Sequence, residues 1–185
     1  MDIKIKKLLP KVKNNILLKN FTTFKIGGRA KYFFPAESNE DILKAVAAAK
    51  KLKLPFFILG AGSNVLISDK GYKGLIIKFQ NPNSKIQIKS KLQNPKIYIE
   101  AGTILGKAVN AAMEAGLAGL EWAAGIPGTV GGAVYGNAGG FGKSMKNAVE
   151  KVEVLDSKSL ELKTYNLKDC RFSYRESVFK KNKNL

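Results

Sequence analysis

A glycine-rich stretch from Gly125 to Gly142 restricts the fold of this chain more than any other feature. It holds eight glycines and no charged side chain, although 25% of the residues in the whole chain are charged. A flexible linker is one interpretation, but linkers are rich in glycine and serine and lack apolar residues such as Ile126 and Val130. Such residues would anchor the stretch while its glycines let backbone amides face a ligand. We therefore expect a ligand held mainly by backbone groups, with hydrogen bonds added by Thr129 and Asn137.

A second glycine loop follows a short apolar run in "FFILGAGSNVLIS", Phe56 to Ser68. The pattern predicts a buried strand that ends at Leu59 and a tight loop over residues 60–64. Two glycines in such a loop favour a phosphate ligand, and the serine and asparagine beside them add uncharged donors. The dinucleotide-binding fingerprint requires a third glycine where this chain has Val65, so the simple Rossmann interpretation fails.

The residue content excludes several kinds of catalytic site. The chain has no histidine, which rules out Ser-His-Asp and Cys-His arrangements and histidine metal ligands within it. Cys170 is the only cysteine, so neither an intramolecular disulfide nor a cluster of paired cysteines around zinc is available. We expect no metal site, and we interpret Cys170 as a small, partly buried thiol.

The formal net charge of +18 has three interpretations. Only three of the 32 basic residues are arginines, and the lysines are spread over the whole chain. Because bidentate recognition of bases and phosphates favours arginine, a solvated lysine surface is favoured over nucleic-acid binding. Anionic small substrates are the third interpretation.

Membrane insertion and secretion find no support in the sequence. No apolar run approaches the roughly 18 residues that span a bilayer, and the first twenty residues interleave lysine with apolar residues, unlike a secretory signal. We therefore expect a cytoplasmic protein without a membrane partner.

Apolar periodicity and turn residues predict an α/β order of elements in the first part of the chain. The predicted elements there are a helix or turn over Ile5–Leu18, extended chain over Thr22–Ile26, a turn at Gly27–Gly28, strands over Arg29–Phe34 and Leu54–Leu59, and a helix over Ile42–Leu52 that follows a Ser38–Asp41 capping pair. Turn-forming residues cluster at positions 80–84, where we place a domain boundary.

Further along, alternating residues predict antiparallel strands, and glycine and threonine mark the ends of a helix. The predicted elements are strands over Leu75–Phe79, Lys85–Lys89 and Lys96–Gly102, a helix over Ile104–Ala115 that Thr103 caps and Gly116 ends, and a hairpin of Val149–Asp156 and Leu160–Leu167 around Ser157–Ser159.

Four segments in this order resemble the bacterial UDP-N-acetylenolpyruvoylglucosamine reductase family, a family of flavoenzymes. They are "NFTTFKIGGRAKYF", "ILGAGSNVLISDKGYKGLII", "GLEWAAGIPGTVGGAVYGNAGGFG" and "CRFSYRESVFK", and they run from about residue 20 to about residue 180. The two glycine loops together are far more specific than either loop alone.

The resemblance implies an α+β fold, namely an FAD-binding domain of the vanillyl-alcohol-oxidase (PCMH) type made of two α/β lobes. It implies an N-terminal extension over residues 1–20, a first lobe over 21–80 and a second lobe over 81–185, with the family's third, substrate-binding domain absent. FAD would be bound noncovalently, because Cys170 lies outside both loops and histidine is absent. The implied cofactor-binding residues are Leu59, Gly60, Ala61, Gly62, Ser63, Asn64, Ile126, Pro127, Gly128, Thr129, Gly131, Gly132, Ala133, Gly136, Asn137 and Ala138.

The resemblance also implies a reaction. In the family, NADPH reduces FAD, and a hydride then reaches the enolpyruvyl group of UDP-N-acetylglucosamine enolpyruvate, giving UDP-N-acetylmuramate for peptidoglycan. Arg175 in "SYRESVFK" matches the family's active-site arginine, and Tyr174 and Ser177 would shape the motif. The alternative for Arg175 is a surface ion pair with Glu176 or another acid.

The family's proton-donating serine and its assisting glutamate belong to the domain that would follow this chain, so the chain alone is expected to be inactive. A non-catalytic FAD-binding module and another oxidoreductase of the same fold type stay open as alternatives. The oligomeric state is not predicted.

Overall fold

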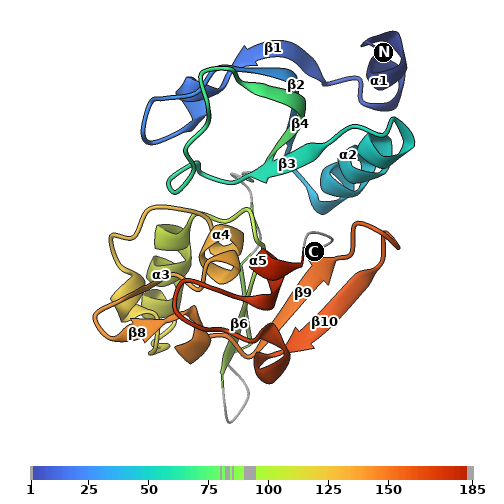
Figure 1. The fold of residues 1–185 in the computed structure, drawn as a ribbon. Helices are drawn as coiled ribbons and strands as arrows, with labels where there is room; N and C mark the ends of the chain where they lie inside the picture. The colour runs from blue at the N-terminus through green and yellow to red at the C-terminus, as the bar shows by residue number, and fades with distance from the viewer. Residues whose placement is uncertain (1, 80, 82–83, 85, 90–94, 183–185) are drawn as a thin grey trace. The chain divides into compact units, whose positions relative to one another are not determined.

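A computed structural model of the chain describes residues 2–79, 81, 84, 86–89 and 95–182 (Figure 1). Contacts divide the chain into two compact units, residues 1–82 and residues 83–185. This division falls within the stretch 80–84 that the turn-forming residues mark. Positions 80, 82 and 83 of that stretch, and Lys85 of a predicted strand, lie outside the described residues. No helix in the described part of the chain has the length and apolar character needed to cross a membrane.

The first unit is built on a four-stranded sheet in the order β1-β2-β4-β3. Its elements are α1 (Asp2–Leu8), β1 (Lys13–Leu17), the 3-10 helix η1 (Leu18–Phe21), β2 (Arg29–Ala36), α2 (Asn39–Lys51), β3 (Phe56–Leu59) and β4 (Tyr72–Phe79). Strand β1 is antiparallel to β2, whereas β2, β4 and β3 are parallel to one another. Parallel strands end at the same edge of a sheet, which is where such folds bind ligands. The loop after β3 therefore begins beside the end of β4.

Helix α2 links β2 to β3 and begins as predicted. The hydroxyl oxygen of Ser38 accepts a hydrogen bond from the backbone N–H of Asp41 at 3.1 Å, which satisfies one of the free donors of the first turn. The Asp41 carboxylate accepts from the backbone N–H of Glu37 instead of that of Ser38, so the capping box is incomplete. The helix contacts strands β2 and β4 of the sheet. Its buried residues are Ile42, Ala45, Val46, Ala48 and Ala49.

The second unit gathers short helices and hairpins around its own core. Its elements are β5 (Ile86–Lys89), β6 (Lys96–Ile99), α3 (Leu105–Glu114), η2 (Glu121–Ala123), α4 (Val130–Tyr135), β7 (Gly139–Gly140), β8 (Lys143–Ser144), η3 (Met145–Asn147), β9 (Lys151–Leu155), β10 (Leu162–Asn166), η4 (Leu167–Cys170) and α5 (Val178–Lys181). Leu105, Val134 and Phe179 bring α3, α4 and α5 into that core, beside Trp122. The antiparallel pairs β5–β6 and β9–β10 confirm the two predicted pairs of alternating strands.

Cys170 is fully buried in this core, where partial burial was predicted. Its Sγ donates to the backbone carbonyl of Asn166 at 3.3 Å, and burial raises the pKa of the thiol. A protonated, enclosed thiol is chemically inert, so Cys170 acts as a core residue.

Two predictions near the N-terminus are wrong. The segment Ile5–Leu18 is not one helix or turn: α1 ends at Leu8, shortly before Pro10, and the chain then forms β1. The segment Thr22–Ile26 is not a strand, because Lys25 adopts a φ of +55° and its N–H bonds back to the carbonyl of Thr22. Strand β1 exists through its pairing with β2, a tertiary contact that local periodicity does not reveal.

The predicted cap of α3 is also wrong. Ile104 occupies the N-cap position, and the Thr103 hydroxyl makes no capping bond. That hydroxyl oxygen is buried and has no hydrogen-bond partner among the described residues. Gly116 does adopt the left-handed conformation expected of a helix stop, with a φ of +66°.

Candidate functional site

The loop Gly60–Asn64 follows β3 and is held at two of its carbonyl groups. Lys78 Nζ donates to the Gly60 carbonyl oxygen at 2.5 Å, and the backbone N–H of Thr23 donates to the Gly62 carbonyl oxygen at 3.0 Å. Gly62 has a φ of +71°, and a Cβ atom there would lie 2.0 Å from the Phe21 carbonyl oxygen. Only glycine fits this position, because any side chain would collide with fixed backbone. The loop is therefore as tight as predicted.

The loop offers a ligand mainly backbone. Leu59, which leads into it, is fully buried in the core of the first unit, so its side chain cannot reach a ligand. Ala61 and Ser63 are partly exposed, and Asn64 is exposed. A loop with short side chains, two of whose carbonyl groups bond to neighbouring segments, suits an anion such as a phosphate. Backbone N–H groups and small hydroxyl or amide donors can surround such an anion.

The second glycine-rich segment, Ile126–Ala138, contains a short helix, α4, which the sequence analysis did not predict. Thr129 caps α4, its hydroxyl oxygen accepting from Gly132 N–H at 3.3 Å. The N–H groups of Val130 and Gly131 donate at 2.8 Å each to the carbonyl oxygens of Thr103 and Ala101, in the turn just before α3. Four more N–H groups donate to carbonyl oxygens inside the segment itself: those of Ala133, Gly136, Asn137 and Ala138. These amides are used within the fold, contrary to the expectation that the stretch directs them at a ligand.

The segment instead has a core side and an exposed side. Val130, Ala133 and Val134 are buried in the core of the second unit. Pro127 and Tyr135 are exposed. The apolar anchors inferred from the sequence are therefore confirmed: Val130 is buried in this core, and Ile126 is partly buried and packs against it. A ligand could contact only the exposed side of the segment.

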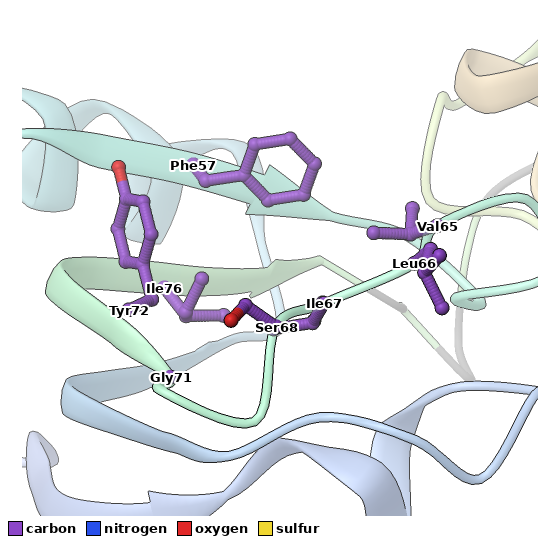
Figure 2. Close-up of a pocket in the computed structure, with 8 residues that line it drawn as sticks. All are labelled: Phe57, Val65, Leu66, Ile67, Ser68, Gly71, Tyr72 and Ile76. Atoms are coloured by element: carbon purple, nitrogen blue, oxygen red, sulfur yellow. The ribbon is translucent and has the colours of Figure 1, made fainter.

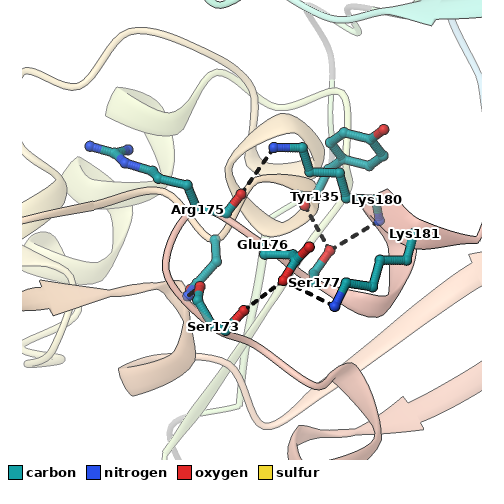
Figure 3. A network of polar contacts seen from close by, with 8 residues as sticks. Tyr135, Ser173, Arg175, Glu176, Ser177, Lys180 and Lys181 are labelled. Atoms are coloured by element: carbon teal, nitrogen blue, oxygen red, sulfur yellow. Dashed lines mark hydrogen bonds and ion pairs between the residues drawn. The ribbon is translucent and has the colours of Figure 1, made fainter.

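Two side-chain hydrogen bonds tie the end of this segment to the turn that carries Arg175. Asn137, which has a φ of +42°, donates through Nδ2 to the Ser173 carbonyl oxygen at 2.8 Å. Its Oδ1 accepts from the backbone N–H of Lys146 at 3.0 Å. The fully buried Ser177 donates through Oγ to the Tyr135 carbonyl oxygen at 2.7 Å, as Figure 3 shows. The glycine segment and the arginine motif therefore form one connected arrangement.

Arg175 lies on a tight turn that fixes its backbone and leaves its head group exposed. Ser173 and Glu176 exchange two backbone hydrogen bonds of 3.1 and 3.2 Å, and Arg175 between them has a φ of +53°. Lys180 Nζ donates to the Arg175 carbonyl oxygen at 3.0 Å. In Figure 3 the guanidinium points away from this network. A non-glycine residue in the left-handed region is held there by its surroundings, and such strain clusters at functional sites.

The alternative ion pair of Arg175 with Glu176 is wrong. The Glu176 carboxylate pairs with Lys181 at 3.0 Å and accepts a hydrogen bond from the Ser173 hydroxyl at 3.0 Å. Within the described ranges, no carboxylate forms an ion pair with the Arg175 guanidinium. The exposed guanidinium of Arg175 therefore takes no part in the ion pairs of this network.

Sequence analysis missed Lys78. It lies opposite Leu59 in the parallel register of β4 and β3, and partial burial lowers the pKa of its ammonium group to about 8. The available signal was the lysine in "LIIKF", because a charged residue interrupts a run that otherwise suits a buried parallel strand.

A cavity of about 210 Å³ lies in the first unit, between β3, β4 and the chain that joins them (Figure 2). None of the predicted site residues lines it. Its lining is mostly apolar, with hydroxyl groups from Ser68 and Tyr72 only: Phe57, Val65, Leu66, Ile67, Ser68, Gly71, Tyr72 and Ile76. This lining has none of the charged or convergent polar groups that a catalytic site needs.

The predicted site residues thus fall in two places. Those from Leu59 to Asn64 lie together in the first unit, whereas the glycine-rich segment and Arg175 lie together in the second. Sequence reasoning missed the contacts from Asn137 to Ser173 and from Ser177 to Tyr135, since they join residues 36 and 42 positions apart.

Comparisons with known proteins identify the family of the chain. The family model described as "FAD binding domain" matches residues 30–164. The UDP-N-acetylenolpyruvoylglucosamine reductase of Clostridium novyi is 39% identical over 97% of this chain and 57% of its own length. That of Caldicellulosiruptor bescii is 44% identical over 90% of this chain and 51% of its own length. The chain therefore spans a little more than half the length of the curated relatives that it matches.

Solved structures give the same fold. The UDP-N-acetylenolpyruvylglucosamine reductase of Thermus caldophilus aligns with a TM-score of 0.73 at 34% identity, covering 90% of this chain and 56% of that protein. A VAO-type flavoprotein of Myceliophthora thermophila aligns with a TM-score of 0.62 at 19% identity, covering 76% of this chain and 27% of that protein, which supports the fold alone. The predicted α+β fold of the vanillyl-alcohol-oxidase (PCMH) type is thereby confirmed. With 135 of its 185 residues inside the matched range, the chain belongs to the family of FAD-binding domains and is a relative of the UDP-N-acetylenolpyruvoylglucosamine reductases.

Proposed function

We propose that the chain is the FAD-binding part of a UDP-N-acetylenolpyruvoylglucosamine reductase, an oxidoreductase of peptidoglycan synthesis. The observation that carries this proposal is the 39–44% identity to reductases of that name over at least 90% of this chain. The same names do not favour a non-catalytic flavin module. NADPH would be the hydride source, UDP-N-acetylglucosamine enolpyruvate the substrate, and the cytoplasm the compartment.

The Gly60–Asn64 loop fits the pyrophosphate of FAD. The close approach of Gly62 to the Phe21 backbone keeps the loop tight, and the Gly60 and Gly62 carbonyl oxygens accept hydrogen bonds from Lys78 and Thr23. In the second unit, the exposed side of Ile126–Ala138 would contact the flavin, with Thr129 and Asn137 holding that segment in shape. When bound, FAD supplies the group that accepts a hydride from NADPH and delivers it to the substrate.

Arg175 would stabilise the charge that the reaction creates. Addition of a hydride to the enolpyruvyl double bond places negative charge on the carbon next to the substrate carboxylate. A guanidinium stays charged at all relevant pH values and can hold a carboxylate through two parallel N–H bonds. The hydrogen bonds of the turn of residues 173–176 fix the backbone of Arg175. Its exposed head group would then reach the substrate. We assign no residue of this chain as the donor of the proton that completes the product.

The net charge of +18 fits this proposal without requiring nucleic acid. NADPH, FAD and UDP-sugars are polyanions, and a positive field raises the rate at which they meet the protein.

The direct test joins this chain to the part of the Clostridium novyi reductase that follows the matched region. We expect the FAD-loaded fusion to oxidise NADPH only when the enolpyruvyl sugar nucleotide is present, measured by the loss of NADPH absorbance. An FAD-loaded fusion whose NADPH oxidation ignores that substrate would overturn the proposal.

A further inference from the structure

Lys78 is a partly buried cation next to the first glycine loop. It lies at the carboxyl end of β4, directly opposite Leu59, in a strand where Leu75, Ile76 and Ile77 are fully buried. Its ammonium group reaches past the end of β3 to the Gly60 carbonyl oxygen, 2.5 Å away. Withdrawing an ammonium group from water costs free energy, and that cost shows in the lowered pKa of Lys78, about 8. An apolar residue at this position would avoid that cost, which indicates that the ammonium group has a function.

The hydrogen bond from Lys78 sets the direction of a backbone N–H group. In a planar trans peptide the carbonyl oxygen and the N–H of the next residue point in opposite directions. The Gly60 carbonyl points at Lys78, so the N–H of Ala61 points away from it. The Gly62 carbonyl points at Thr23 in the same way, which turns the N–H of Ser63 away from Thr23. Donors from neighbouring segments therefore orient two peptide units of the loop, the one between residues 60 and 61 and the one between residues 62 and 63.

This arrangement has the features of an anion site made of backbone. Successive N–H groups of a tight loop can surround a phosphate, and a cation close behind them strengthens the attraction in a region of reduced dielectric. Lys78 supplies both the orientation and the charge. Every group involved lies in the first unit: Phe21, Thr23, Gly60–Asn64 and Lys78.

We propose that Lys78 is a positioning residue for the FAD pyrophosphate, holding the Gly60 carbonyl so that the Ala61 N–H faces the diphosphate and adding positive charge behind the loop. This inference rests on the proposed function, because it assigns the diphosphate to this loop. It predicts that Lys78 acts on the phosphate-bearing half of the cofactor and not on the flavin ring.

The test compares three ligands on the full 185-residue chain: FAD, ADP and riboflavin. FAD and riboflavin are titrated by flavin fluorescence, and ADP by its displacement of FAD. We expect Lys78→Met to weaken FAD and ADP about tenfold each, the loss of one charged hydrogen bond, and to leave riboflavin unchanged. Lys78→Arg, which keeps the charge and a donor, should stay within about threefold of the wild type. Lys73→Met, at an exposed position of the same strand, is the matched control.

Two results would overturn the role of Lys78. One is wild-type affinity of Lys78→Met for FAD; the other is an equal loss of FAD and riboflavin binding, which marks general damage to the fold. Circular dichroism checks folding, and Lys78→Gln, which keeps a donor without the charge, replaces Lys78→Met if that variant does not fold. A folded wild-type chain that binds none of the three ligands would refute the proposed function itself, and the Lys78 role with it.

Discussion

At the scale of single residues, Arg175 carries the central chemical prediction. Its guanidinium makes no ion pair in the described part of the chain, while its backbone is fixed by the turn and by Lys180. Replacing it with alanine in the fusion enzyme should lower kcat by about 100- to 1,000-fold, because one preorganised charge is lost from the transition state. Stopped-flow reduction of the substrate measures this step directly, and FAD content should stay unchanged.

The control for this prediction is Arg171→Lys. Arg171 lies four residues earlier in the same motif and also has a positive φ, of 48°, but it has no proposed role. Equal losses of kcat in both variants would show that the motif was merely disturbed. Full activity of Arg175→Ala would refute the role of its charge.

Gly62 makes the second prediction at this scale. Alanine there would need a φ of +71° and would place Cβ 2.0 Å from the Phe21 carbonyl oxygen, so backbone must move. We expect Gly62→Ala to lower the free energy of unfolding by about 2 kcal/mol or more and to weaken FAD binding. Urea unfolding followed by circular dichroism measures the first effect.

Gly106→Ala is the matched control for Gly62→Ala. Gly106 lies inside α3, and a Cβ atom there would meet nothing within 4 Å. Alanine should therefore stabilise the helix, by about 0.5–1 kcal/mol. A Gly62→Ala protein as stable as the wild type would mean that the loop is not held as described.

At the scale of elements, the β9–β10 hairpin depends on one carboxylate. The side chain of Asp156 accepts hydrogen bonds from the backbone N–H groups of Lys158 and Ser159 and pairs with Lys163 at 2.6 Å. The Lys163 hydrogen bond is the main cause, and together these bonds lower the pKa of Asp156 from 3.8 to about 2. A carboxylate with a lowered pKa stabilises the fold above its unfolded pKa and loses that effect as the pH falls through its folded pKa.

Asp156→Asn should therefore lower the melting temperature at pH 6, and the gap to the wild type should narrow between about pH 4 and pH 2. Thermal unfolding across that pH range measures it, with Glu153→Gln at an exposed position of β9 as the control. A gap that stays constant with pH would show that the Asp156 charge does not hold the turn.

The same scale shows how far sequence reasoning reaches. Helix α2 and the β9–β10 hairpin were predictable, because a capping serine and strict alternation are local signals. Strand β1 and the cap of α3 were not, since both depend on partners distant in sequence. The glycine-rich segment was identified, but α4 inside it was missed because glycine is a poor helix former and packing overrides that propensity.

The candidate site shows the same contrast between local signals and contacts that are distant in sequence. Motifs indicated both glycine segments and Arg175 as candidate site residues, whereas Lys78, a single lysine in an apolar strand, belongs to no motif. The hydrogen bonds of Asn137 and Ser177 join the arginine turn to the glycine segment across long separations, and no local pattern encodes them.

At the scale of the whole molecule, candidate site residues occur in each of the two units. The first provides the loop suited to a diphosphate, and the second provides the glycine segment together with the arginine turn. Each unit has its own core, so each can hold its part of the site in shape.

The most direct test of this view is an FAD titration of the purified 185-residue chain, followed by its visible absorption spectrum. We predict saturation at one FAD per chain, a shifted flavin band, and release of intact FAD into the supernatant after heat denaturation, as noncovalent binding requires. A chain that is folded by circular dichroism but takes up no FAD would contradict the assignment of both glycine segments to the cofactor.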